Sequence, residues 1–215
     1  MSDATLNSLG WSNMVPPRAQ RSFRRLWTCI ALSVAALTTP AISANALDAA
    51  HRAFIPITAV APPPVAAREL CARYSWACAT TVGRQSIRNT DMERVSFINK
   101  QVNRETREIS DQRQYRIADR WSLPTRIGGD CEDFAIKKKY ALISAGFPPE
   151  SLLIATVLDG RSQPHAVLLV RTEAGDFILD NLNNEIRRWF ASGYTFLRMQ
   201  NPENPKSWVT VFAKS

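Results

Sequence analysis

The spacing of apolar residues changes at Pro149, and this change constrains the fold more than any other feature of the chain. Before Pro149, two segments repeat apolar residues every three or four positions, which is typical of amphipathic helices. After it, short apolar runs such as "LLIATVL" at 152–158, "HAVLLVR" at 165–171, "DFILD" at 176–180 and "WVTVFA" at 208–213 are typical of strands. Helices followed by strands indicate an α+β fold, in which helices cover an antiparallel sheet.

The first helical segment is expected from residue 89 to about 108. Its apolar residues form one face, which consists of Met92, Val95, Ile98 and Val102. Thr90, with Glu93 three residues later, predicts a capping box at its start. The stretch "DRWSLPTRIGGD" that follows contains Pro124 and two glycines, so we expect it to be non-helical.

The second helical segment is expected to begin at Cys131 and to end before Gly146. Its core face consists of Cys131, Phe134, Ala135, Ala141, Leu142 and Ala145. Asp130 is the expected N-cap, which puts Cys131 in the first turn, at the positive end of the helix dipole. The basic triplet at 137–139 is expected to form a solvated face of this helix.

Two of the predicted strands are joined by the short link "TEAGD", whose Gly175 favours an antiparallel hairpin. Pairing across this hairpin puts position 165 opposite about 180–184. We therefore expect His165 and Asp180 to lie at the same open end of the sheet, which packs on the helix that carries Cys131.

The N-terminal region is typical of an export signal followed by a linker. Four arginines between positions 18 and 25 precede the apolar run "LWTCIALSVAAL", and Ala44 and Ala46 offer a cleavage site. Because this run is shorter than the roughly 20 residues that span a bilayer, we expect cleavage and no stable membrane insertion afterwards. Residues 1–46 are thus predicted to be a signal peptide for export to the periplasm, 47–67 a proline-rich linker and 68–215 the folded domain.

The charge of the chain does not indicate a nucleic-acid partner. The formal net charge is +8, but four of the positive charges lie within the predicted signal peptide. The remaining basic residues form no stripe with interleaved aromatic residues, which is the pattern of a nucleic-acid-binding surface.

Three of the four cysteines lie beyond the predicted signal peptide. Cys71 and Cys78 are close in sequence, and an oxidising compartment favours a disulfide between them. Cys131 is then left as an unpaired thiol, which is either buried or used in chemistry.

Cys131, His165 and Asp180 are predicted to act as a nucleophile, a base and the residue that orients the base. His165 is the one histidine of the predicted domain, because His51 lies in the predicted linker. In such a triad the histidine pairs with the thiolate and then protonates the leaving amine, while the carboxylate holds the ring. The alternative is an inert buried thiol and a structural histidine.

Two further residues are weaker candidates near this triad. Trp121, upstream of Cys131, is the first of them, and the backbone N–H of Cys131 is itself placed to donate to an oxyanion. Asn181 is predicted to support the site from behind Asp180. A core tryptophan and a turn asparagine are the alternatives.

Three carboxylates, Asp130, Glu132 and Asp133, surround Cys131 in the sequence. Acidic residues favour helix N-termini, which explains one or two of them. Each of them also raises the pKa of a neighbouring thiol unless its charge is compensated. A bound divalent cation would compensate it, and carboxylate and carbonyl oxygens are the ligands that calcium prefers.

Three long stretches of the chain resemble a known family. They are "GGDCEDFAIKKKYALISAGFPPESLLIATVL", "HAVLLVRTEAGDFILDNL" and "RRWFASGYTFLRMQNPENPKSW". Together they resemble the bacterial transglutaminase-like cysteine proteinases over about residues 68–213. The resemblance implies a papain-like transglutaminase core with Cys131, His165 and Asp180 as the triad. It also implies calcium bound by Asp130 and Glu132, with Asp133 less directly matched. Related folds use an indole upstream of the cysteine, which implies that Trp121 supplies a second oxyanion donor or lines the cleft.

The resemblance also implies a biological setting. Characterised members are periplasmic LapG-type proteases that cut surface adhesins. A protein substrate such as a large adhesin, a role in biofilms and an inner-membrane regulatory receptor are therefore expected for this chain.

Two other functions remain open at this point. A transglutaminase- or amidase-type acyl transferase would use the same triad and would differ in whether water or an amine accepts the acyl group. A calcium-regulated binding module would keep the fold without turnover. A broken triad would indicate such a module, yet all three predicted members are present.

Overall fold

The structure is a computed structural model that describes residues 52–82 and 86–214. The predicted signal peptide and its cleavage site lie outside these residues. Within them, no helix combines the length and the apolar character needed to cross a bilayer.

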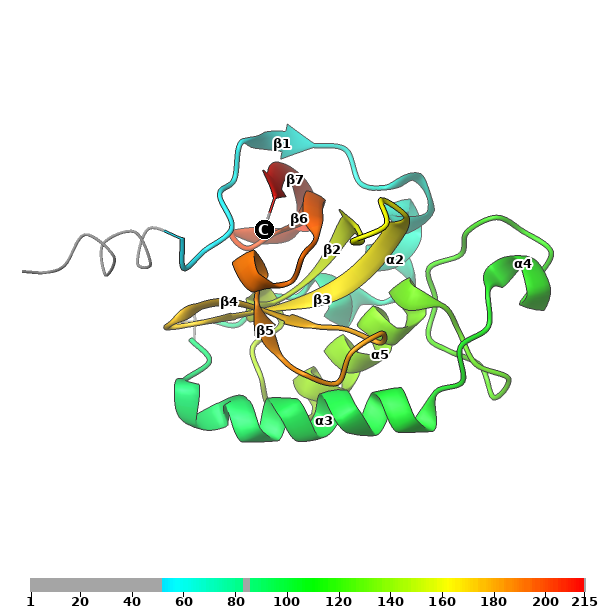
Figure 1. The fold of residues 1–215 in the computed structure, drawn as a ribbon, viewed down its shortest axis with the longest axis horizontal. Helices are drawn as coiled ribbons and strands as arrows, with labels where there is room; N and C mark the ends of the chain where they lie inside the picture. The colour runs from blue at the N-terminus through cyan, green and yellow to red at the C-terminus, as the bar shows by residue number, and fades with distance from the viewer. Residues whose placement is uncertain (1–51, 83–85, 215) are drawn as a thin grey trace, which may run out of the picture. The chain divides into compact units, whose positions relative to one another are not determined.

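In the described part of the chain, seven strands form one antiparallel sheet, in the order β1-β7-β6-β2-β3-β4-β5 (Figure 1). The strands are β1 (Ala59–Ala61), β2 (Leu152–Leu158), β3 (Pro164–Thr172), β4 (Gly175–Leu179), β5 (Arg187–Arg188), β6 (Thr195–Asn201) and β7 (Asn204–Lys214). The α+β class and the hairpin of β3 and β4 are confirmed. The strands β1, β5 and β6 were not predicted from the sequence.

Two long helices, α3 (Met92–Glu105) and α5 (Cys131–Ser144), cover one side of the sheet, and α5 lies between α3 and β3 (Figure 1). The shorter helical elements are η1 (Val65–Glu69), α2 (Leu70–Arg73), η2 (Ser75–Cys78), η3 (Asn89–Asp91), α4 (Asp111–Gln114), η4 (Pro149–Ser151) and η5 (Trp189–Ala191). The predicted cap at Thr90 and Glu93 is wrong. The cap lies slightly earlier, where Asp91 accepts a hydrogen bond from the backbone N–H of Arg88 at 3.1 Å.

The sheet has a hydrophobic cluster on each face. Along β2, Leu152 and Ile154 face the cluster that contains α3 and α5, whereas Leu153 and Ala155 face a second cluster. Neighbouring residues of a strand point to opposite faces, so burial of both faces requires a continuous apolar run. This explains why "LLIATVL" shows no alternation of apolar and polar residues.

The helix α5 is more deeply buried than its sequence predicts. Lys138 is 1% exposed and Lys139 is 0% exposed, so the predicted solvated face is wrong for these two residues. Lys139 donates a hydrogen bond from Nζ to Oε1 of Gln200 at 2.8 Å. Burial lowers the pKa of each lysine to about 7, although Asp180 raises that of Lys138 and Glu150 raises that of Lys139. The sheet, α3 and η2 all contact this helix, so little of its surface faces solvent.

Ordered packing begins before Arg68, where the sequence placed the domain boundary. Ile55 is 2% exposed, and its backbone N–H donates to Oδ2 of Asp176 at 2.8 Å. The strand β1 pairs with β7 along the sheet edge. The described part of the predicted linker therefore belongs to the domain, because an extended segment can add an edge strand even where prolines flank it.

The predicted disulfide between Cys71 and Cys78 is present, with the two Cα atoms 5.5 Å apart. We expect Cys71→Ser to lower the free energy of unfolding by about 2–4 kcal/mol, because the bridge restricts the unfolded chain. Urea denaturation of the oxidised protein measures this difference. Under reducing conditions, the variant and the wild type should have nearly the same midpoint. Equal midpoints without reductant would contradict the prediction.

Candidate active site and acidic cluster

Two glycines precede α5 at positions where the backbone packs closely against neighbouring residues. Gly128 has a φ of +139°, and a Cβ atom there would lie 2.0 Å from the carbonyl oxygen of Arg107. At Gly129, a Cβ atom would lie 2.5 Å from Oδ2 of Asp133. Only glycine fits such close approaches. They place Cys131 as the first residue of α5.

His165 and Asp180 contact each other at one end of the sheet, as the predicted hairpin register requires. Nε2 of His165 lies 2.9 Å from Oδ1 of Asp180, and both side chains are largely buried. His165 is near the start of β3, and Asp180 directly follows β4. Although burial raises the pKa of Asp180, hydrogen bonds from His165 and Tyr194 hold it below its usual value.

The thiol of Cys131 lies beside a carboxylate and beside β3. Sγ is 3.3 Å from Oε2 of Glu132, and it also interacts with the backbone N–H of Ala166, the residue after His165. Burial and the neighbouring Glu132 raise the pKa of the thiol well above its usual range, against the effect of the Ala166 N–H. These surroundings therefore favour the protonated form of the thiol.

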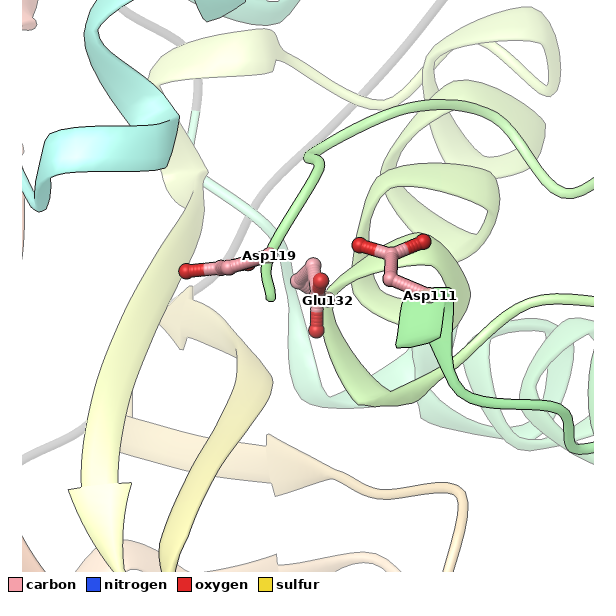
Figure 2. Close-up of side chains that lie close together, drawn as sticks. All are labelled: Asp111, Asp119 and Glu132. Carbon is pink, nitrogen blue, oxygen red and sulfur yellow. The ribbon is translucent and has the colours of Figure 1, made fainter. Parts of the chain in front are cut away.

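Five carboxylates gather next to this thiol, and they come from three segments. They are Asp111 of α4, Asp119 of the following loop, and Asp130, Glu132 and Asp133 at the start of α5. Asp111, Asp119 and Glu132 offer ligand atoms that all lie within 4.8 Å of one another (Figure 2). Asp111, Asp130 and Asp133 form a second such group. The structure thus brings the three predicted ligands together and adds Asp111 and Asp119.

Several oxygens of this cluster have no hydrogen-bond partner among the described residues. They are both carboxylate oxygens of Asp111, Oδ1 of Asp130 and Oδ2 of Asp133. Asp111 is 1% exposed and Asp133 is 0% exposed. Buried charges without a partner are unfavourable, so this arrangement fits a bound cation.

The remaining oxygens of the cluster show how the protein holds it in place. Oδ2 of Asp130 accepts from the backbone N–H of Asp111 at 3.0 Å, and Oδ1 of Asp133 accepts from the N–H of Ser122 at 2.9 Å. Asp130 thus occupies the predicted N-cap position, but its side chain bonds to α4 and makes no cap hydrogen bond to α5.

The pKa values of these carboxyl groups reflect their burial and their closeness to one another. Burial, together with nearby carboxylates, raises the pKa of Asp111 to about 6, of Asp133 to about 7 and of Glu132 to about 10. Without a cation, the protein therefore holds protons in this cluster at pH values where free carboxyl groups are ionised.

The two weaker candidates have different surroundings. The indole of Trp121 packs edge-on against Trp208, with ring centroids 5.8 Å apart, and belongs to the hydrophobic core. Asn181 directly follows Asp180, and its Oδ1 is buried without a partner among the described residues. Sequence reasoning missed Asn103, which donates to the backbone oxygen of Asp180 at 2.8 Å, and Tyr194. Asn103 is 77 positions from Asp180 in the sequence. Tyr194 is only 14 positions away, but no motif marks either residue.

A family model described as "bacterial transglutaminase-like cysteine proteinase BTLCP" matches residues 57–215. The chain belongs to this family. Solved structures of Legionella pneumophila LapG are similar to this proteinase. The calcium-bound form is 26% identical, with a TM-score of 0.48, over 58% of this chain and 71% of that chain. The EGTA-treated form is 28% identical, with a TM-score of 0.44, over 51% of this chain and 63% of that chain. No curated protein matches the chain significantly.

The glycine before Asp130 offers a test of the acidic cluster in this proteinase. We expect Gly129→Ala to lower the free energy of unfolding by about 1–3 kcal/mol, because the added methyl group would press on the Asp133 carboxylate. Thermal denaturation measures the effect. Gly160→Ala is the matched control, since a Cβ atom there meets nothing within 4 Å. Equal melting temperatures for the two variants would contradict the prediction.

Proposed function

We propose that this chain is an exported, calcium-dependent cysteine endopeptidase with Cys131, His165 and Asp180 as its triad. The main support is the 2.9 Å contact between Nε2 of His165 and Oδ1 of Asp180, in a member of a cysteine proteinase family. The unpaired thiol of Cys131 interacts with the backbone N–H of Ala166, the residue after His165, which brings it to the same strand. Export rests on the predicted signal peptide at residues 1–46.

The proposed reaction assigns one role to each residue. His165 accepts the thiol proton at Nδ1, because Nε2 already bonds to Asp180. The sulfur of Cys131 then attacks the peptide carbonyl, a C–S bond forms, and the C–N bond breaks as His165 protonates the leaving nitrogen. Water hydrolyses the thioester with His165 as the base, which restores the thiol. The backbone N–H of Cys131 donates to the oxyanion.

The acidic cluster is proposed to hold calcium. Its unpartnered oxygens on Asp111, Asp130 and Asp133 support this assignment, and Asp119 and Glu132 complete the set of oxygen ligands. A bound calcium ion supplies positive charge that balances these carboxylates. With its charge balanced, Glu132 opposes ionisation of the Cys131 thiol less strongly, which favours the reactive thiolate.

The substrate is proposed to be a protein, with a large surface adhesin as the first candidate. Periplasmic location and control by an inner-membrane receptor are proposed on the same basis, which is the resemblance to LapG-type proteases together with the predicted export signal.

A cleavage assay on isolated outer-membrane proteins tests the proposal. We expect wild type with calcium to release a fragment that neither Cys131→Ala nor the calcium-free wild type releases. A labelled amine added to the same reaction separates hydrolysis from acyl transfer. Incorporation of the amine in place of hydrolysis would favour a transferase, and the same bands with Cys131→Ala would contradict the proposed triad.

A further inference from the structure

Tyr194 contacts both the histidine and the aspartate of the proposed triad. Its hydroxyl donates a hydrogen bond to Oδ2 of Asp180. Its ring packs edge-on against the imidazole of His165, with centroids 5.8 Å apart and an interplanar angle of 75°. One side chain therefore touches the base and the residue that orients the base.

The hydrogen bonds of Asp180 are divided between its two oxygens. Oδ1 contacts Nε2 of His165 and accepts from the backbone N–H of Leu182 at 3.0 Å. Oδ2 accepts from the hydroxyl of Tyr194. Because both oxygens accept hydrogen bonds, the carboxylate cannot rotate without losing one of them. Hydrogen bonds to an ionised group are stronger than those between neutral groups, so this loss would be unfavourable.

The sheet register sets the position of Tyr194. It directly precedes β6, whose first residue, Thr195, pairs with Leu158 of β2. On the other side of β2, Val157 pairs with His165 of β3. Tyr194 and His165 are therefore held at the same end of three adjacent strands, which is a rigid way to place a supporting residue.

We propose that Tyr194 is a positioning residue that fixes the Asp180 carboxylate and, through it, the ring of His165. This inference rests on the proposed function. A fixed carboxylate at Nε2 keeps the proton of neutral His165 on that nitrogen, which leaves Nδ1 to accept the thiol proton. The ring of Tyr194 limits rotation of the imidazole from its edge.

Tyr194→Phe tests the hydroxyl while it keeps the ring. We expect kcat for cleavage to fall about tenfold, which corresponds to about 1.4 kcal/mol in the barrier, with KM unchanged. Tyr140→Phe is the matched control and should leave kcat unchanged. Tyr140 lies in the second half of α5 and is 47% exposed, and its ring packs against that of Trp76 in η2.

A second readout does not depend on proteolysis. The chain has two histidines, so nitrogen-15 NMR of a Cys131→Ala, His51→Ala background reports His165 alone. We expect a protected Nε2–H signal at low field in this background and with Tyr140→Phe. With Tyr194→Phe, the signal should shift or broaden, because the carboxylate that holds the proton becomes mobile.

The outcomes separate this inference from the proposed function. A changed His165 signal in a protein that cleaves nothing would support the positioning role and contradict the protease. An unchanged signal together with an unchanged kcat would overturn the positioning role, and so would a lower melting temperature with an unchanged signal. If Tyr194→Phe does not fold, wild type labelled with 3-fluorotyrosine replaces it. Its more acidic hydroxyl should move the His165 signal, and no movement would overturn the inference.

Discussion

Replacement of Cys131 by alanine is expected to lower the rate of substrate cleavage by at least about 10⁴-fold, because no other group replaces the nucleophilic sulfur. The melting temperature should change by less than about 3 °C, which corresponds to about 1 kcal/mol for a chain of this size. Cys131 is half-buried in the first turn of α5, and alanine favours helix there. A cleavage assay and a thermal scan measure the two effects. Global unfolding of the variant would instead assign Cys131 a core role.

Alkylation of the thiol provides the control for this experiment. In calcium-loaded wild type, we expect iodoacetamide to label Cys131 rapidly, because the imidazole of His165 favours the thiolate. His165→Ala should slow labelling sharply while it leaves the thiol in place. Equal labelling rates in the two proteins would show that the histidine does not activate the sulfur, and an inert thiol in both would favour the binding-module alternative.

Removal of calcium is expected to have the second largest effect. A ligand at 100 times its dissociation constant stabilises the folded state by about 2.7 kcal/mol, so a chelator should lower the melting temperature by about 5–10 °C and abolish cleavage. Asp111→Asn keeps the size of the side chain but removes a charge with two unpartnered oxygens. This variant should lose most of the calcium-induced rise. Glu173→Gln, at an exposed position outside the cluster, should keep all of it. A full calcium response in Asp111→Asn would contradict the assigned site.

The calcium response should also depend on pH, with a defined sign. In the metal-free protein, the pKa values of Asp111 and Asp133 rise from 3.8 to about 6 and about 7. Because the folded state binds these protons more tightly, their contribution to stability is full below pH 3.8 and is lost as the pH rises through 7. The difference in melting temperature with and without calcium should therefore grow between pH 5 and pH 8. A difference that stays constant, or that shrinks, would contradict this account.

Local patterns in the sequence were sufficient for the parts of the molecule that are close along the chain. The hairpin of β3 and β4 has a link of two residues between Thr172 and Gly175, so its register brings His165 to Asp180 with few alternatives. The disulfide between Cys71 and Cys78 joins two residues that are seven positions apart in the sequence. The two long helices follow from the 3.6-residue spacing of apolar residues, and β2, β3, β4 and β7 follow from short apolar runs, because both patterns are properties of consecutive residues.

Other features depend on what packs against each element. The basic triplet of α5 has the composition of a solvated face, yet Lys138 and Lys139 are buried because the sheet, α3 and η2 surround the helix. The segment that contains Ile55 has the composition of a linker, yet it packs on the sheet. The composition of a segment therefore does not settle its solvent exposure, because exposure depends on which other elements pack against it.

The candidate site likewise combines features that depend on neighbouring residues with features that depend on tertiary packing. Residues that are neighbours in the chain are enough to place a thiol at a helix N-terminus among acidic residues, and a short link is enough to bring a histidine to an aspartate across a hairpin. Only the packing of separate elements brings Asp111 and Asp119 to Glu132 and Tyr194 to Asp180. These residues are brought together by an irregular loop and by the pairing of distant strands. Such contacts leave no periodic pattern in the sequence, because they join separate elements of the fold. The packing of the whole domain offsets the conformational entropy that is lost in forming them.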